Sequence, residues 1–245
     1  MNLLEVQGLR KTYPAFRLED VSFSVLEGAV MGLIGRNGAG KSTTLKSILG
    51  LVHPDAGRVE MFGREFSENE RYIKENIGVV LGGIDFYPKK KVRTITDVTR
   101  RFYSNWQEEK YRHYLDLFAI DENKRVDQLS SGMRVKYLLA LALSHNARLL
   151  ILDEPTSGLD PVSRDELTEL LRRIASDGTR SVLFSTHITS DLEKCASHIT
   201  FIQEGRLQRS DTLAGFMAHY ADLGSTLEEI IVAAERRPYD ADAII

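Results

Sequence analysis

The sequence predicts an α/β fold in which a mostly parallel sheet is joined to a strand-rich first third and a helical middle third. In the last third, short apolar stretches alternate with stretches of helical periodicity, which is typical of a parallel sheet. The length of 245 residues suits one large domain or two modest lobes. With 42% hydrophobic and 27% charged residues, the composition is that of a globular protein.

The first third is predicted to consist of strands and tight turns around one helix. Apolar residues alternate with serines over 21–25, the pattern of a strand that is buried on one face. The apolar stretch 29–34 suits a central strand that is buried on both faces. We expect a helix over 41–49, which ends close to Gly50, and a further strand over 58–62.

The middle third changes to helical periodicity. Helices are predicted over 94–103, over 108–118 and from Met133 onward. In the first of them, Ile95, Val98 and Phe102 are expected to share one face. We expect these helices to form a lobe of their own over about 84–146.

The last third returns to strands separated by helices. Buried strands are predicted over 148–152, 181–185 and 199–202. Leucines and an isoleucine over 167–174 form the apolar stripe of a helix, and a second amphipathic helix is predicted over 226–234. We expect the α/β unit to extend to about residue 215, and a helical extension with a polar tail to occupy 216–245.

Charge and composition argue against several classes of protein. The formal net charge is -3, from 32 basic and 35 acidic residues, so the charge balance gives no reason to expect a nucleic-acid partner. No apolar stretch approaches the roughly 18 residues that cross a bilayer, and the first residues lack the pattern of a secretion signal. We therefore expect a cytoplasmic protein, any membrane role of which comes through a partner. The single cysteine, Cys195, is expected to be an ordinary buried or half-buried thiol.

A glycine-rich loop between a predicted strand and a predicted helix matches the phosphate-binding pattern GxxxxGK[ST]. Glycines let backbone N–H groups surround phosphate oxygens, and the start of the following helix favours negative charge. Lys41 supplies a positive charge for the β and γ phosphates, and the Ser42 hydroxyl suits Mg²⁺. The residues expected to surround the nucleotide phosphates are Gly35, Asn37, Gly38, Ala39, Gly40, Lys41, Ser42 and Thr43. The sequence therefore predicts a site for a nucleoside triphosphate with Mg²⁺; the family resemblance given below implies that the nucleotide is ATP.

Two carboxylates follow the buried strand predicted near residue 150. Asp153 is expected at the carboxyl edge of the sheet, where ligands of open α/β folds bind, and there it can reach the hydration shell of Mg²⁺. Glu154 points elsewhere and can orient or deprotonate the attacking water. An Asp-Glu pair alone carries little weight, but it gains weight where it follows a phosphate loop.

Three further motifs resemble those of the ABC (ATP-binding cassette) ATPases. Leu129-Ser130-Ser131-Gly132-Met133 is similar to the LSGGQ signature, residues 153–160 match the end of Walker B and the D-loop, and Ser185-Thr186-His187 matches the switch histidine segment. The resemblance implies a P-loop NTPase core with a mostly parallel sheet, an N-terminal antiparallel β subdomain and a helical signature subdomain. The cassette is then expected over 1–215.

The resemblance also implies roles for single residues. Tyr13 sits where an aromatic ring stacks on adenine, and His187 would contact the γ-phosphate beside the catalytic Glu154 and Lys41. Ser42 and Asp153 would hold Mg²⁺. Residues expected to contact ATP held by a second cassette, or to link the two sites, are Ser130, Gly132 and Asp160.

Two departures from the family pattern motivate an alternative interpretation. Ser131 and Met133 replace a glycine and a glutamine of the signature, and Gly82 stands where the family usually has a glutamine. Glycine has no polar side chain, so one contact to Mg²⁺ or water is lost. A regulatory cassette with reduced hydrolysis is therefore an alternative to an active motor.

The short chain and segments such as Ser144-His145-Asn146 resemble bacterial ATP-binding subunits of ABC-2 type exporters. This implies a second cassette and a transmembrane permease as partners, a place on the inner face of the cell membrane, and peptides or amphipathic compounds as cargo. The rival class is a soluble ABC ATPase acting on ribosomes or DNA, which lacks support in the charge balance. Residues expected either to contact the permease or to form the core of the lobe are Phe86, Tyr87, Arg93 and Tyr103.

Overall fold

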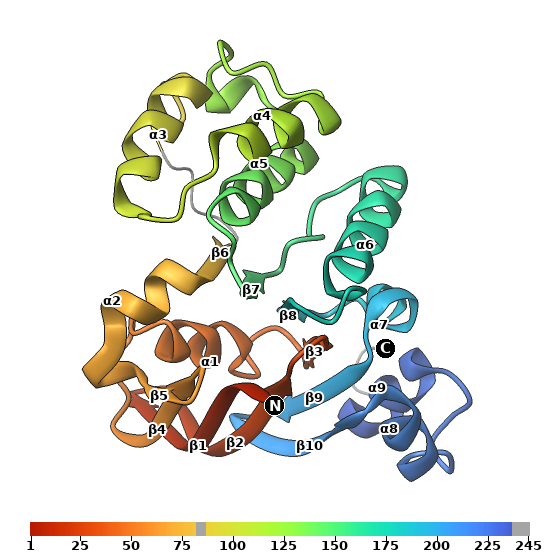
Figure 1. Cartoon of the computed structure of the whole chain (residues 1–245). Coiled ribbons are helices and arrows are strands. Elements are labelled where there is room, and N and C mark those ends of the chain that lie inside the picture. The colour runs from red at the N-terminus through yellow and green to blue at the C-terminus, as the bar shows by residue number, and fades with distance from the viewer. Residues whose placement is uncertain (82–86, 237–245) are drawn as a thin grey trace.

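The computed structural model describes residues 1–81 and 87–236, which form a sheet, a helical lobe and two C-terminal helices (Figure 1). The strands are β1 (Asn2–Tyr13), β2 (Phe16–Leu26), β3 (Val30–Ile34), β4 (Ala56–Met61), β5 (Arg64–Glu65), β6 (Ile77–Leu81), β7 (Leu149–Asp153), β8 (Ser181–Thr186), β9 (His198–Gln203) and β10 (Arg206–Thr212). The α-helices are α1 (Lys41–Ile48), α2 (Phe66–Asn76), α3 (Val92–Thr99), α4 (Glu108–Leu117), α5 (Ser131–Ser144), α6 (Pro161–Ala175), α7 (Thr189–Cys195), α8 (Leu213–His219) and α9 (Leu227–Glu235).

The strands pair in the order β5-β4-β1-β2-β10-β9-β3-β8-β7-β6. From β9 to β6 every pairing is parallel, and all residues of β3, β7 and β8 are buried because the sheet is packed on both faces. β1 pairs antiparallel with both β2 and β4. The predicted α/β class, with its mostly parallel core and antiparallel N-terminal part, is confirmed.

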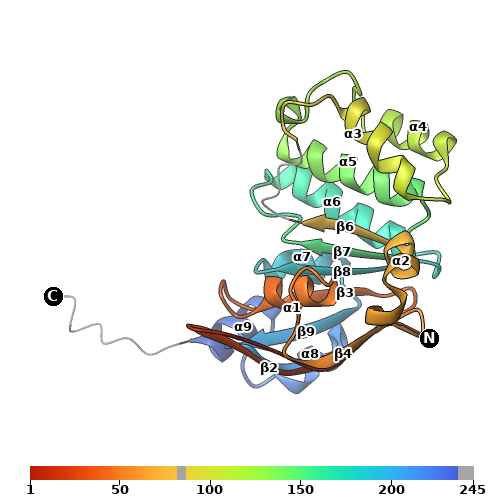
Figure 2. The same ribbon diagram turned by 90° about the vertical axis from the view of Figure 1, so that its left-hand side faces the viewer.

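The helical lobe lies beyond β6, at one edge of the sheet (Figure 2). It has its own apolar core, in which Val92, Tyr111 and Tyr137 are buried. The hydroxyl of Thr96 lies 2.7 Å from that of Tyr111 and 2.9 Å from that of Tyr137, so these three buried hydroxyl groups are hydrogen-bonded to one another.

Two expectations for the lobe were wrong. The first helix ends at Thr99 and passes into a 3-10 turn (Arg100–Phe102), so Phe102 lies beyond the helix that carries Ile95 and Val98. Val98 is 54% exposed and Phe102 is 72% exposed. The third helix begins at Ser131, two residues earlier than predicted, because the side chain of Ser130 caps it.

The C-terminal helices pack on the main core. Phe216 of α8 is fully buried, and its ring meets that of Phe201 of β9 edge-on at 6.2 Å. Leu227 and Ile230 of α9 are fully buried in the same cluster. The boundary expected at residue 215 therefore falls inside α8.

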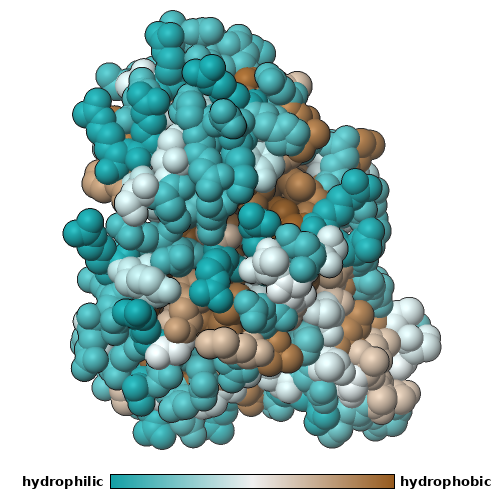
Figure 3. Space-filling view, in the orientation of Figure 1, coloured by the Kyte–Doolittle hydropathy of each residue, from teal (hydrophilic) through white to brown (hydrophobic). Residues whose placement is uncertain are grey.

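Figure 3 shows a mostly hydrophilic surface on the face of the molecule seen in Figure 1, with hydrophobic side chains gathered between the lobe and α6 and over the C-terminal helices.

Within residues 1–81 and 87–236, no helix is long and apolar enough to span a membrane. Cys195 is a buried thiol, as expected, and it donates to the backbone carbonyl of Asp191. Burial raises the pKa of the Cys195 thiol to about 12, which leaves it unreactive at neutral pH.

Candidate functional site

The glycine-rich loop leaves β3 and enters α1 through a left-handed turn. Gly40 has φ of 114°, and a Cβ there would lie 2.9 Å from the ring of Phe16. Lys41, the first residue of α1, is buried, and its Nζ donates to the carbonyl oxygens of Gly35 (2.7 Å) and Arg36 (3.2 Å). The lysine is thus folded back over the loop that it belongs to.

The tip of the loop is exposed, and the residues after it enter α1. Asn37 and Gly38 are exposed, Ala39 is buried, and Ser42 and Thr43 are half-buried in the first turn of α1. Gly38 has φ of 85°, and nothing lies within 4 Å of the position of a Cβ there. The first turn of α1 contains no acidic residue, so its free N–H groups and positive end favour an anion.

Asp153, the last residue of β7, is held by two hydroxyl groups. Ser42 Oγ donates to Asp153 Oδ1 at 3.0 Å, and Ser185 Oγ donates to the same oxygen at 2.6 Å. The carboxylate is 7% exposed, and parallel pairing of β7 with β8 sets Asp153 directly opposite Ser185. Ser185 also accepts a hydrogen bond from the N–H of Glu154 at 2.9 Å. One hydroxyl therefore fixes two consecutive acidic residues.

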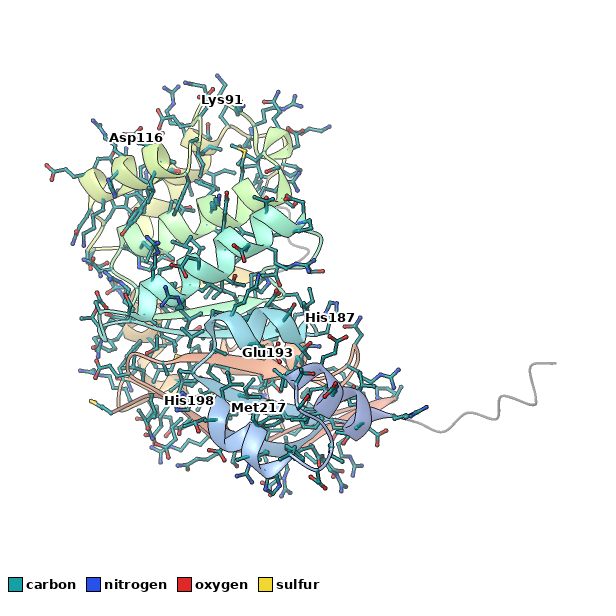
Figure 4. The ribbon with its side chains drawn as sticks, turned by 90° about the vertical axis from the view of Figure 1, so that its right-hand side faces the viewer. Lys91, Asp116, His187, Glu193, His198 and Met217 are labelled. Atoms are coloured by element: carbon teal, nitrogen blue, oxygen red, sulfur yellow. The ribbon has the colours of Figure 1, made fainter. Side chains whose placement is uncertain are left out.

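Glu154 turns away from Asp153 because its backbone has φ of 50°, in the left-handed region. Its Oε1 lies 3.3 Å from Lys41 Nζ, and its Oε2 lies 2.8 Å from Nδ1 of His187. The Glu154 side chain is 20% exposed and that of His187 is 41% exposed. Figure 4 shows His187 at the surface, in the loop between β8 and α7. Lys41, Glu154 and His187, which are far apart in sequence, form one connected group.

The oxygens of Ser42 and Asp153 fit a small hard cation. Mg²⁺ prefers oxygen ligands, uses few protein side chains, and completes its shell with phosphate and water. The hydroxyl and the carboxylate are already 3.0 Å apart, at the base of the phosphate loop. In the part of the chain that the structure describes, no group of three or more His, Cys, Asp or Glu residues could hold a metal ion by itself. A metal held by Ser42 and Asp153 would take its other ligands from water and from the phosphates of a nucleotide.

The signature and D-loop residues cap two helices. Ser130 Oγ accepts from the N–H of Met133 (3.2 Å) at the start of α5. Asp160 Oδ1 accepts from the N–H groups of Val162 (3.0 Å) and Ser163 (3.1 Å) at the start of α6, and hydrogen bonds from Ser163 hold the pKa of Asp160 below its ordinary value. The two helix starts adjoin, since a Cβ on Gly132 would lie 3.4 Å from the side chain of Ser163.

These capping residues are separate from the lysine group. Among the described residues, no hydrogen bond or ion pair of Ser130 or Asp160 reaches Lys41, Asp153 or Glu154. At the start of α5 the N–H groups of Met133 and Arg134 are bonded to Ser130, which leaves those of Ser131 and Gly132 as a second place where an anion could bind. The substituted Ser131 uses its hydroxyl within the chain, where it donates to the carbonyl of Gly158 at 3.4 Å.

Tyr13 ends β1 and presents its ring to solvent. It is 40% exposed, and the ammonium group of Lys11 lies 5.8 Å from the centre of its ring. The ring is therefore available for stacking. Gly82 and Phe86 lie outside the described residues.

A cavity of about 520 Å³ lies between β6 and the helical lobe. Residues that line it include Val79, Ile95, Val98, Tyr103, Leu138 and His145. The rings of Tyr103 and His145 stack at 3.7 Å, and Tyr87 at the rim is 69% exposed. His145 is 2% exposed and, in residues 1–81 and 87–236, its Nδ1 has no hydrogen-bond partner. Arg93 is exposed but does not line this cavity.

Two residues of the site are not evident from the sequence. Ser185 belongs to the switch histidine segment, and its position just before His187 was a usable signal. Glu235, in the last turn of α9, accepts a hydrogen bond from the N–H of Arg36 at 3.1 Å. Nothing in the sequence connects two residues so far apart.

Comparison with known proteins identifies the family. The ABC transporter family matches residues 18–157, more than half of the chain. The chain belongs to this family. The bacitracin transport ATP-binding protein BcrA of Bacillus licheniformis is 32% identical over 208 residues, covering 84% of this chain and 68% of the relative. The Nod factor export ATP-binding protein I of Burkholderia orbicola is 38% identical over 191 residues, covering 76% of this chain and 62% of the relative.

Solved structures of ABC proteins share the fold. A structure described as the ATP-binding subunit of an ABC transporter superposes with a TM-score of 0.84 at 28% identity, covering 96% of this chain and all of the other. A dimeric ATP-binding cassette bound to ADP and phosphate has a TM-score of 0.75 at 21% identity, covering 86% of this chain and 98% of the other, and shows the fold alone. The family expected from the motifs is confirmed, whereas the roles of single residues stay predictions.

Proposed function

We propose that this ABC family member is the ATP-hydrolysing subunit of an exporter, and that it dimerises around ATP to drive a transmembrane partner. The observation that carries the proposal is the group of Lys41, Glu154 and His187 beside the Ser42–Asp153 pair. It combines a phosphate-binding cation, a base and an orienting imidazole in one place. The bacitracin and Nod factor relatives support export, and peptides or amphipathic compounds as cargo.

Lys41 and Glu154 exchange partners during the reaction. In the structure Glu154 is bound to Lys41 at 3.3 Å. Entering β and γ phosphates would take over Lys41, which leaves Glu154 free to accept a proton from water. That water attacks the γ-phosphorus, so that ATP and water yield ADP and phosphate. His187 holds the second oxygen of Glu154 and fixes its direction. Mg²⁺ held by Ser42, Asp153 and the phosphates would neutralise charge on the leaving group.

A second cassette would complete the site. The free N–H groups near Ser130 and Gly132 form an anion site that is separate from the chain's own phosphate loop. A partner cassette turned to face it would bring its own γ-phosphate there, and Asp160 would lie at the interface. Because the contact depends on the γ-phosphate, hydrolysis would loosen the dimer.

The apolar cavity beside the lobe is the proposed contact for the permease. It joins exposed rings such as Tyr87 to buried apolar side chains, as an inserted apolar helix requires. The unpartnered Nδ1 of His145 would accept a donor from that segment. Docking here would hold the chain on the inner, cytoplasmic face of the cell membrane. Tyr87 and Tyr103, which line the cavity, would then contact the permease.

Phosphate release tests the proposal. The wild type should hydrolyse ATP, and Glu154→Gln, which keeps the size of the side chain but removes the base, should bind ATP with turnover lowered by about 10²-fold or more. Gel filtration of this variant with Mg-ATP should give a dimer. Glu109→Gln, an exposed glutamate of the lobe, is the matched control and should behave as wild type.

Three results would contradict parts of this proposal. A Glu154→Gln variant that stays monomeric with Mg-ATP would argue against the sandwich. Equal turnover in wild type and variant would remove Glu154 as the base. ATP binding without turnover in either protein would favour the regulatory cassette that the glycine at position 82 suggests.

A further inference from the structure

The last described helix, α9, is fixed firmly to the body of the protein. Its first turn is capped by Thr226 and Glu229, and Leu227 and Ile230 are fully buried. The N–H of Leu227 donates to Glu193 of α7 at 2.8 Å, and Figure 4 shows Glu193 between the two helices. At the other end, the side chain of Gln203 donates to the carbonyl of Ala234 at 3.1 Å. The end of α9 therefore has a defined position.

That end places a carboxylate on the phosphate loop. Glu235 Oε1 accepts the N–H of Arg36 at 3.1 Å, and Oε2 lies 3.7 Å from Nε of Arg36. The Glu235 side chain is only 5% exposed, whereas the Arg36 side chain is 63% exposed. Burial raises the pKa of Glu235, while Arg36 and the charge of Lys41 oppose that rise. The charge of Lys41 therefore stabilises the Glu235 carboxylate.

A buried carboxylate at this place is unfavourable unless the loop itself stabilises it. The loop offers the backbone N–H and the guanidinium of Arg36, and the charge of Lys41 adds to them; these are the same kinds of group that bind phosphate. Glu235 therefore uses part of the positive potential that a nucleotide needs. Once a triphosphate occupies the loop, the same carboxylate faces added negative charge in a site of low dielectric.

We propose that Glu235 is an internal anion of the phosphate site, which lowers nucleotide affinity and couples ATP binding to the docking of α9. The inference rests on the proposed function, since it assumes that the loop binds ATP. Coupling is reciprocal: if docked Glu235 weakens ATP binding, then bound ATP weakens the docking of α9 to the same degree. The docking of α9 thereby depends on whether the loop is filled.

Charge and packing can be separated by substitution. Glu235→Gln keeps the length of the side chain and an oxygen that can accept the Arg36 N–H, but it removes the negative charge. Glu228 lies on the exposed side of the same helix, so Glu228→Gln is the matched control for charge alone. A purely structural Glu235 would lose some stability on substitution without gaining affinity.

The test is titration calorimetry of ATP binding, without turnover, on the Glu154→Gln background. Glu235→Gln should bind ATP about fivefold or more tightly than its parent, with a smaller difference at 0.5 M salt. Glu228→Gln should match the parent. Equal or weaker binding by Glu235→Gln would overturn the inference. A parent protein that binds no ATP would instead overturn the proposed function, and the inference with it.

Hydrogen exchange gives a second measurement that needs no substitution at Glu235. In the parent protein, amides of 227–235 should exchange faster when Mg-ATP is bound than when it is absent. Unchanged or slower exchange there would overturn the coupling, even if the affinity of Glu235→Gln rose.

Discussion

The hydroxyl of Ser185 contacts both acidic residues of the site, so Ser185→Ala is an informative perturbation of the catalytic geometry. The serine is fully buried in β8. It donates to Asp153 at 2.6 Å and accepts from the N–H of Glu154 at 2.9 Å. Alanine leaves the strand and its packing unchanged but removes both contacts.

The magnitude follows from these two contacts. A buried polar group that loses its partner costs about 1–3 kcal/mol. The variant leaves the Glu154 N–H without its acceptor and Asp153 with Ser42 as its remaining side-chain donor. We expect the free energy of unfolding to fall by about 2–4 kcal/mol. Because Glu154 sits in a left-handed backbone conformation that needs support, we also expect turnover to fall about ten- to hundredfold.

Ser181 in the same strand provides the control. It is also fully buried, and its hydroxyl donates to the carbonyl of Leu26 at 2.9 Å, far from both carboxylates in the strand register. Ser181→Ala should cost about 1 kcal/mol and leave turnover unchanged. Urea unfolding and phosphate release, measured on both variants, give the comparison.

Two results would refute this reasoning. If both variants lose the same free energy of unfolding, the second contact of Ser185 contributes nothing. If Ser185→Ala keeps full turnover, Glu154 does not depend on Ser185 for its position, and the strained backbone must be held by other contacts.

Two further predictions concern the lobe. Val98→Asp, in the apolar cavity, should abolish membrane association when the chain is expressed with an adjacent membrane-protein gene, whereas Leu117→Asp, of similar exposure but outside the cavity, should not. ATP turnover of the isolated chain should survive both changes. If Val98→Asp still associates with the membrane, the cavity is not the contact with the permease. Burial lowers the pKa of His145 to about 4, so between about pH 6.5 and pH 4 the imidazole is protonated in the unfolded chain but neutral in the folded chain. The free energy of unfolding should therefore be highest above pH 6.5 and should fall by about 2 kcal/mol between pH 7 and pH 5, measured by urea unfolding of the wild type. His145→Phe, which keeps a ring against Tyr103, should lose that part of the pH dependence; an unchanged slope would show that other groups cause it.

The strands and the nucleotide motifs were predictable because their signals are local. A glycine-rich loop between an apolar strand and a helix needs only eight consecutive residues to be recognised, and the loop 35–42 lies where it was expected. Asp153 was expected at the carboxyl edge of the sheet and ends β7 there, whereas its contact with Ser42 was not predicted. Local patterns therefore predicted where the loop after β3 and the acidic end of β7 lie, while the roles of their residues stay predictions.

Other features were not predictable because their cause lies elsewhere in the chain. The exposure of Val98 and Phe102 follows from the 3-10 turn and the open cavity beside it, which the periodicity of 94–103 does not reveal. The left-handed backbone at Glu154 is imposed by contacts to β8, since nothing in an Asp-Glu-Pro stretch demands it. Glu235 reaches Arg36 only because α9 packs back on the sheet.

The sheet order has a consequence for how the protein is made. Strand β3 is entirely apolar and buried, but both strands that pair with it come much later in the chain. Val30 pairs with Val182 of β8, and Met31 pairs with His198 of β9. During synthesis at about 5–20 residues per second, β3 leaves the ribosome roughly 8–30 s before either neighbour exists. The hairpin of β1 and β2 needs only local contacts and can form in that time. The nascent chain therefore carries an unpaired apolar strand for much of its synthesis, and a chaperone that covers 30–34 would raise the yield of folded protein.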